Sequence, residues 1–275
     1  MARLTVPGVF RAHLAVIAAF VAAHVATKAV SLATGRDHLL GLAPLFNLAR
    51  EDGPANFFSA AALLVAAGVA WLLWRAEPDR RTARGWGVAA LVLAFLAFDE
   101  GAGLHDRLAV LLQARFETTG VFYIAWVVPY AALVLLVGAV CLPLLRALPR
   151  ATLTRLVAAG ALYVGSAMGM ELFQSALLSE AAQGARLGEF DRTELNRDPL
   201  VVASVTAEEA GEMLAVALAL RALLLHLVGH LGVRSVALSL GRAGTSPTVP
   251  FAPPPSAAAA AVGRREDAHY EVAAE

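Results

Sequence analysis

Six long runs of apolar residues dominate the sequence and restrict what the chain can fold into. They cover residues 12–34, 54–75, 86–108, 121–146, 152–178 and 200–229. A helix needs about 20 apolar residues to cross a hydrocarbon core about 30 Å thick. Inside lipid only helices and closed barrels satisfy every backbone polar group, and these runs are far too long to be barrel strands. The sequence therefore predicts an all-α, polytopic transmembrane helix bundle with about six spans.

The composition also fits a chain surrounded by lipid. Hydrophobic residues make up 59% of the 275 positions and charged residues 16%, whereas soluble domains carry roughly 25% charged residues. The formal net charge is zero, so nothing indicates nucleic acid as a partner. A single cysteine, Cys141, excludes an intramolecular disulfide and a thiolate metal cluster. The expected partners are membrane lipids and a lipid-soluble substrate.

Arginine residues gather in alternate loops and predict how the chain crosses the membrane. These arginines are Arg75, Arg80, Arg81, Arg84, Arg146, Arg150, Arg155, Arg234 and Arg242. The positive-inside rule places both termini in the cytoplasm, and we expect the chain in an inner (plasma) membrane. Residues 1–241 then form the transmembrane domain. The stretch 242–275 is rich in proline and alanine and is predicted to be a disordered cytoplasmic tail.

Seven carboxylates interrupt three of the apolar runs. They are Asp99, Glu100, Asp106, Glu171, Glu208, Glu209 and Glu212, and His105 lies next to Asp106. A charged residue at the centre of a span costs about 2.5–3.5 kcal/mol on the insertion scale. Such residues inside spans usually mark a functional site, so we expect this set to have a function.

The depth of these residues suggests that they belong to one site. At 1.5 Å per residue, all three acidic segments fall in the outer half of the membrane, at about the depth of His24 and Lys28. Each of the secondary candidates also has a structural interpretation. In that interpretation His24 is a hydrogen-bonded packing residue, Lys28 pairs with a carboxylate or reaches the interface, and Asp106 is solvated at the boundary.

The excess of acidic groups indicates that protons or bound cations balance the charge. Carboxylates and imidazole suit a divalent transition metal such as Fe, Mn or Zn. The expected ligands are Asp99, Glu100, His105, Glu171, Glu208 and Glu212. Glu209 is the candidate general base. The Glu-x-x-His spacing of ferritin-like di-iron proteins is missing, because Glu100 and His105 are five residues apart.

Three short motifs carry a resemblance to a known group of proteins. They are Asp99-Glu100 followed by His105-Asp106, then Gly169-Met170-Glu171, and then the segment from Glu208 to Met213. Together they resemble the motifs of a widespread family of uncharacterised bacterial multi-pass membrane proteins. Asp106 stands where that pattern more usually has glutamate. The resemblance covers about residues 50–230 and implies a shared site, without naming a reaction.

Three functions are compatible with such a site. The leading hypothesis is a metal-dependent enzyme that acts on a lipidic substrate near the outer leaflet. The second is a proton- or cation-coupled transporter or channel that uses the same carboxylates as a relay. The third is a non-catalytic membrane assembly protein, in which the polar cluster fixes how helices or partners pack.

Overall fold

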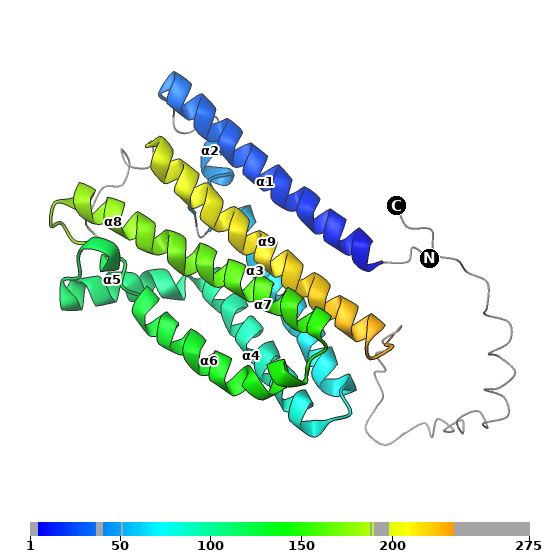
Figure 1. The fold of residues 1–275 in the computed structure, drawn as a ribbon. Helices are drawn as coiled ribbons and strands as arrows, with labels where there is room; N and C mark the ends of the chain where they lie inside the picture. Colours follow the sequence, from blue (N-terminus) through cyan, green and yellow to red (C-terminus); the bar gives the residue numbers. More distant parts are fainter. Residues whose placement is uncertain (1–4, 37–40, 51, 188, 190–197, 234–275) are drawn as a thin grey trace, which may run out of the picture. The chain divides into compact units, whose positions relative to one another are not determined.

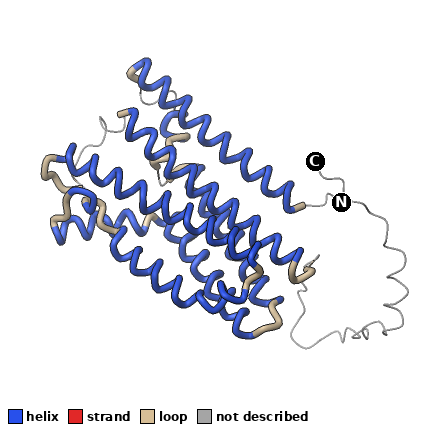
Figure 2. Tube along the Cα trace, in the orientation of Figure 1, coloured by secondary structure: helices blue, strands red, loops and turns tan. Residues whose placement is uncertain are grey.

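Every secondary-structure element in the described residues of this chain is a helix. The computed structural model describes residues 5–36, 41–50, 52–187, 189 and 198–233. The helices are α1 (Val6–Thr34), α2 (Leu42–Leu45), α3 (Pro54–Ala76), α4 (Arg80–Ala102), α5 (Leu104–Phe116), η2 (Gly120–Phe122), α6 (Val127–Ala147), α7 (Arg150–Val164), η3 (Gly165–Met170), α8 (Glu171–Ala182) and α9 (Pro199–Gly229). Figures 1 and 2 show how these helices lie together in a bundle.

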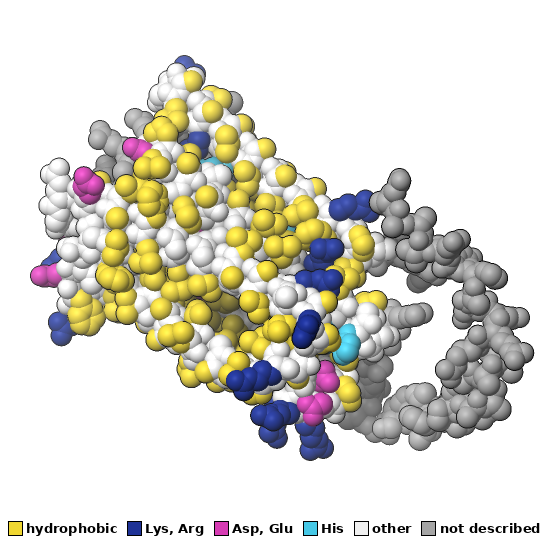
Figure 3. All heavy atoms as spheres, viewed as in Figure 1, with side chains coloured by type: hydrophobic (Ala, Val, Ile, Leu, Met, Phe, Trp, Pro, Cys, Tyr) yellow, Lys and Arg dark blue, Asp and Glu magenta, His cyan; other side chains and the backbone are white. Residues whose placement is uncertain are grey.

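Six helices in the described residues are long and apolar enough to cross a membrane. They are α1, α3, α4, α6, α9 and the continuous helix Arg150–Ala182, which joins α7, η3 and α8. Their surface is largely apolar, and charged side chains gather toward the two ends of the helices (Figure 3). The all-α fold with six candidate spans is therefore confirmed, whereas the cytoplasmic position of both termini stays a prediction.

Local sequence signals explain where several of these helices begin. The side chain of Thr5 accepts a hydrogen bond from the backbone N–H of Gly8 at the start of α1. Asp79 caps α4 in the same way, and Asp198 caps α9. Proline is the first residue of both α3 and α9, where its missing N–H costs nothing. Each of these helices therefore begins at a capping residue or a proline that precedes an apolar stretch.

The packing centres on α9 and on the hairpin of α3 and α4. α9 packs against α1, α3 and α7, while α6 packs against α4. At the end of the bundle where α4 begins, a core cluster includes Leu73, Trp86, Leu144 and Leu223. There a β-carbon on Gly85 would overlap Leu144, so α4 and α6 meet closely at this end.

The third apolar run does not form one helix over residues 86–108. α4 ends at Ala102 because Gly103 has φ +57°, in the left-handed region that favours glycine. The chain turns there and begins α5, so His105 and Asp106 lie in the first turn of α5. The helical-wheel relation between Asp99 and Asp106 that a continuous helix would give therefore does not hold.

The other expected spans lie within or beside the observed helices, with shifted ends. The first span begins at Val6 instead of residue 12. The fourth begins at Val127, after the short helix η2, instead of residue 121. The fifth continues to Ala182 and contains the π-helical turn η3. The proposed tail 242–275 lies outside the described residues.

We predict that Gly103→Ala destabilises the protein by about 1–2 kcal/mol, because a residue with a β-carbon is strained in the left-handed region. Nothing lies within 4 Å of the added carbon, so the backbone conformation alone causes the loss. Gly101→Ala is the matched control, since Gly101 lies inside α4 and its new carbon would meet only Ala60 at 3.8 Å. Thermal unfolding in detergent measures both variants, and equal melting temperatures would contradict the prediction.

Candidate functional site

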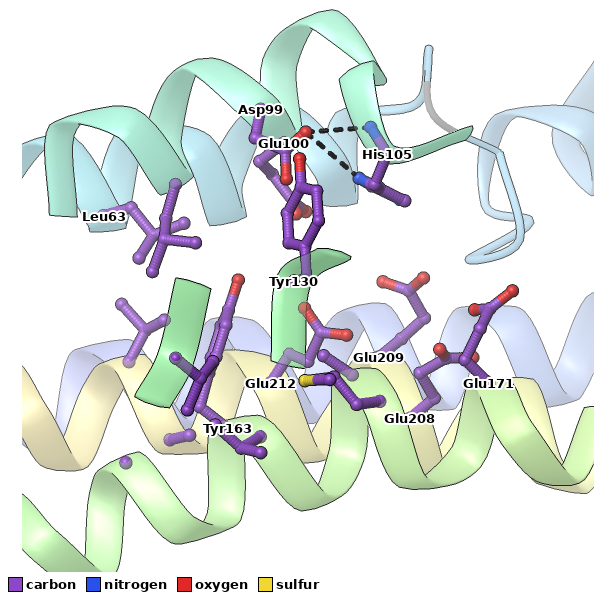
Figure 4. A pocket seen from close by; sticks show the side chains of 18 of the residues that line it. Leu63, Asp99, Glu100, His105, Tyr130, Tyr163, Glu171, Glu208, Glu209 and Glu212 are labelled. Atoms are coloured by element: carbon purple, nitrogen blue, oxygen red, sulfur yellow. Dashed lines mark hydrogen bonds and ion pairs between the residues drawn. The ribbon is translucent and has the colours of Figure 1, made fainter. Parts of the chain in front are cut away.

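Acidic side chains from three helices face one shared space in the bundle. We call Asp99, Glu100, Glu171, Glu208, Glu209 and Glu212 the carboxylate cluster. Asp99 and Glu100 come from the end of α4, Glu171 begins α8, and the other three lie on α9. Figure 4 shows the α4 residues on one side of the space and the α8 and α9 residues on the other. The convergence that the sequence only suggested is therefore present.

Asp99 is held by groups around the break between α4 and α5. Its Oδ1 atom accepts a hydrogen bond from the backbone N of His105 at 3.0 Å and lies 3.4 Å from the His105 Nδ1 atom. The hydroxyl of Tyr130, on α6, donates a further hydrogen bond to Asp99. The imidazole of His105 also packs against Trp126. Asp99 and His105 thus support the start of α5 as well as lining the site.

Glu100 is positioned through its backbone by a side chain on α3. The break at Gly103 ends the backbone hydrogen bonds of α4, so the last carbonyl groups of this helix require other donors. Asn56, which is buried, donates its Nδ2 hydrogen to the Glu100 carbonyl oxygen at 2.8 Å. The side chain of Glu100 is directed toward α9 (Figure 4).

Glu171 and Glu208 meet between α8 and α9. Their carboxyl groups lie within hydrogen-bonding reach of each other. The Nε2 group of Gln174 also donates to Glu208 Oε2. A β-carbon on Gly211 would overlap the Ser166 side chain, so α9 lies directly against η3. Extra-residue turns such as η3 often occur at functional sites, and this one precedes Glu171 immediately.

Glu209 and Glu212 point into the shared space together with Tyr163 from α7 (Figure 4). Glu212 and Glu100 are close enough to Tyr163 to act on it electrostatically. Two tyrosine hydroxyls, those of Tyr130 and Tyr163, therefore lie among the acidic groups. They can donate hydrogen bonds to carboxylates or to a bound ligand.

The shared space is one end of a large cavity. The cavity has a volume of about 1450 Å³ and is lined mainly from α4, α6, α7 and α9, with residues from α1, α2, α3, α5, α8 and η3. All six residues of the carboxylate cluster line it, together with His105, Tyr130 and Tyr163. The rest of the lining is mainly aliphatic. The cavity therefore joins a polar end to an apolar end.

The secondary candidates, His24, Lys28 and Asp106, differ in whether they line the cavity. Lys28 and Asp106 both line the cavity, and Asp106 is exposed. His24 is buried, and its Nδ1 atom accepts a hydrogen bond from the backbone N of Leu48 at 3.1 Å. His24 is not among the lining residues of this cavity, and it fixes the segment after α2. This geometry corresponds to the packing interpretation of His24.

An ion pair lies beside the cavity in the segment between α2 and α3. Arg50 lines the cavity, and its Nη2 atom is 2.6 Å from Asp52 Oδ2. Hydrogen bonds from the guanidinium hold the pKa of Asp52 below its usual value. Both side chains are exposed to the surroundings of the bundle.

Four functional candidates do not appear in the sequence analysis. They are Asn56, Tyr130, Tyr163 and Gln174, whose contacts are given above. The sequence could have indicated Gln174, because it lies three residues after Glu171 on the same helix face. The sequence could also have indicated Tyr163, because tyrosine usually occurs near the ends of spans and Tyr163 lies inside one. Asn56 and Tyr130 gained their roles only through packing.

The present side-chain arrangement does not form a metal site in the part of the chain that the structure describes. No group of three or more His, Cys, Asp or Glu side chains in those residues is placed to hold a metal ion. Asp99 and Glu208 already accept hydrogen bonds from protein donors. Glu100, Glu209 and Glu212 face the same space from two helices (Figure 4).

We predict that Asp99→Ala lowers the free energy of unfolding by about 1–3 kcal/mol, because it removes the acceptor for buried donors at the start of α5. Asp106→Ala is the control, since Asp106 is exposed in the same turn. Unfolding of the purified protein in detergent measures both variants. A similar loss in the two variants would contradict the role of Asp99 in holding the break.

Comparison with known proteins identifies a family but no characterised relative. No curated protein and no solved structure matches the chain. A family model described as a domain of unknown function, DUF8692, matches residues 13–227. The matched stretch contains every residue of the carboxylate cluster and most of the chain. The expectation of an uncharacterised family is confirmed at this level, and the chain belongs to the DUF8692 family.

Proposed function

We propose that this protein is a membrane-embedded enzyme that acts on the polar part of a lipid-like substrate. The observation that carries the proposal is the single cavity of about 1450 Å³ that joins the carboxylate cluster to an apolar end. Sites for drug-sized ligands usually measure about 300–1,000 Å³. A larger, two-part cavity inside apolar helices suits an amphiphile with a hydrocarbon chain. In the orientation expected from the arginines, the reacting part lies in the outer half of the membrane.

The carboxylate cluster can supply acid–base chemistry in this proposal. Glu209 points into the shared space and serves as the general base (Figure 4). The neighbouring carboxyl groups of Glu171 and Glu208 serve in this proposal as a store of protons next to the reacting group. Tyr130 and Tyr163 orient the polar part of the substrate through their hydroxyls. The apolar surroundings strengthen each of these interactions.

A divalent transition metal, Fe, Mn or Zn, is the further component that we propose. The cluster has more acidic groups than cations, and a bound cation would relieve the repulsion. Glu100 and Glu212, which have long side chains on two facing helices, would be the first carboxylate ligands of such an ion (Figure 4). A metal held there would polarise the substrate or activate water.

A specific observation also favours the second candidate, proton-coupled transport. The hydrogen-bonded carboxyl groups of Glu171 and Glu208 are the kind of pair that passes protons in pumps and transporters. In this alternative the amphiphile or cation moves through the cavity unchanged. The two candidates differ in whether the lipid is chemically altered.

The proposed activity predicts that the purified protein converts a lipid in vesicles made from a total bacterial lipid extract. Mass spectrometry of the lipids, with Fe, Mn or Zn added in turn, detects the product. Glu209→Gln should lower the rate by at least about 100-fold, because it removes the general base without changing the size of the side chain.

The control for this experiment is Glu180→Gln, since Glu180 is an exposed glutamate near the end of α8 and outside the cavity lining. It should convert lipid at the wild-type rate. If the wild-type protein changes no lipid with any of the three metals, the enzymatic proposal is wrong. A proton-coupled flux in the same vesicles would then support the transport alternative.

Metal content is measured separately, by mass spectrometry of protein purified without chelators. We expect a transition metal in about stoichiometric amount in the wild-type protein. The double variant Glu171→Gln and Glu212→Gln should lose it, because two of the acidic groups become neutral amides. Equal metal content in both proteins, or none in either, would contradict a metal held by the carboxylate cluster.

A further inference from the structure

The apolar end of the cavity extends from the carboxylate cluster toward the region where α4 and α6 meet. It is lined by side chains and glycines from four helices, among them Leu93, Gly138, Cys141, Leu144, Gly160 and Leu223. Trp86 also lines this end, and it is buried in the core cluster together with Leu144 and Leu223. α4 and α6 meet closely at Gly85 and Leu144, and we take this contact as the closed end of the cavity.

The length of this end matches one lipid chain. Trp86 and Asp99 are 13 positions apart on α4, which corresponds to about 20 Å at 1.5 Å per residue. On α9, Glu212 and Leu223 are 11 positions apart, or about 17 Å. One leaflet is half of a hydrocarbon core of about 30 Å, so a membrane lipid chain spans about 15 Å. A single extended chain therefore fits between the carboxylate cluster and the closed end.

The cavity is open on one side of the bundle, between α6 and α7. α6 packs mainly on α4, whereas α7 packs mainly on α9. Figure 3 shows a hollow in the apolar surface in this region. Gly138 on α6 and Gly160 on α7 both line the cavity, and a β-carbon added at either would have no heavy atom within 4 Å. Exposed apolar side chains, including Leu135 and Val157, lie on the same two helices.

We propose that the opening between α6 and α7 is a side entrance from the lipid, and that the apolar end binds one straight hydrocarbon chain of the substrate. The inference rests on the proposed function and names the substrate class, a lipid whose reacting polar part is attached to a single long chain in the site. The chain enters sideways without passing through the polar surface of the membrane. The closed end at Trp86, Leu144 and Leu223 limits its length.

The one cysteine of the chain allows binding at this site to be measured by chemical labelling. Cys141 lines the apolar end and is partly accessible. The experiment measures the rate at which N-ethylmaleimide labels Cys141 in protein held in a short-chain detergent. The probes are 1-acyl lysophospholipids with straight chains of increasing length. We expect labelling to slow several-fold as the chain lengthens, and to slow no further once the chain exceeds the length of the cavity.

Gly160→Leu fills the opening from the side of α7 and should abolish the protection by every probe. Leucine has a higher helix propensity than glycine, and open space lies around the new side chain, so this variant should fold. Gly68→Leu is the matched control, because Gly68 is an exposed helical glycine on α3 with the same open space and does not line the cavity. It should be protected like the wild-type protein.

Two results would overturn the inference. One is protection that does not depend on chain length, and the other is equal protection in Gly160→Leu and Gly68→Leu. Lipid conversion by the wild-type protein with either of these results would leave the proposed enzyme standing without this chain site. Length-dependent protection without any lipid conversion would support the chain site and contradict the enzyme.

Discussion

The burial of acidic side chains among apolar helices constrains the rest of this structure. A carboxyl group in a membrane span has no water to satisfy it, so the protein must supply donors, protons or cations. Asp99 uses the backbone of His105 and the hydroxyl of Tyr130. Glu208 uses Gln174 and the carboxyl group of Glu171. Each of these donors comes from a neighbouring turn or helix, so the cluster fixes how those elements meet.

This constraint also explains why the helices are irregular around the site. The break at Gly103 places the first turn of α5 next to Asp99. The backbone N–H of His105 therefore bonds Asp99, whereas in a straight helix it would bond a carbonyl group of the same helix. The π-helical turn η3 lies directly before Glu171 and against Gly211 of α9. Backbone irregularity at membrane depth is tolerated where it is buried in protein or lines a cavity. Both irregularities here are next to the acidic end of the cavity.

The cavity follows from the way the helices are paired. Close contact at Gly85 and Leu144 joins α4 to α6 at one end, while α7 follows α9. Small residues such as Gly138 and Gly160 leave the space between the two pairs unfilled. An amphiphile would gain little from burying its chain in protein instead of lipid. The polar contacts at the carboxylate cluster would therefore supply most of the selectivity.

The sequence by itself determined the all-helical fold, the six candidate spans and the six acidic residues of the cluster, because hydrophobic length and charges inside spans are local properties. It also predicted a common depth for the acidic segments, since rise per residue is fixed. Only the tertiary structure decided that they share one space, that Gly103 breaks the third span, and that Tyr130, Tyr163 and Asn56 belong to the site. These features depend on which helix faces are packed together and on where a glycine adopts a positive φ, and hydrophobic periodicity does not encode either property.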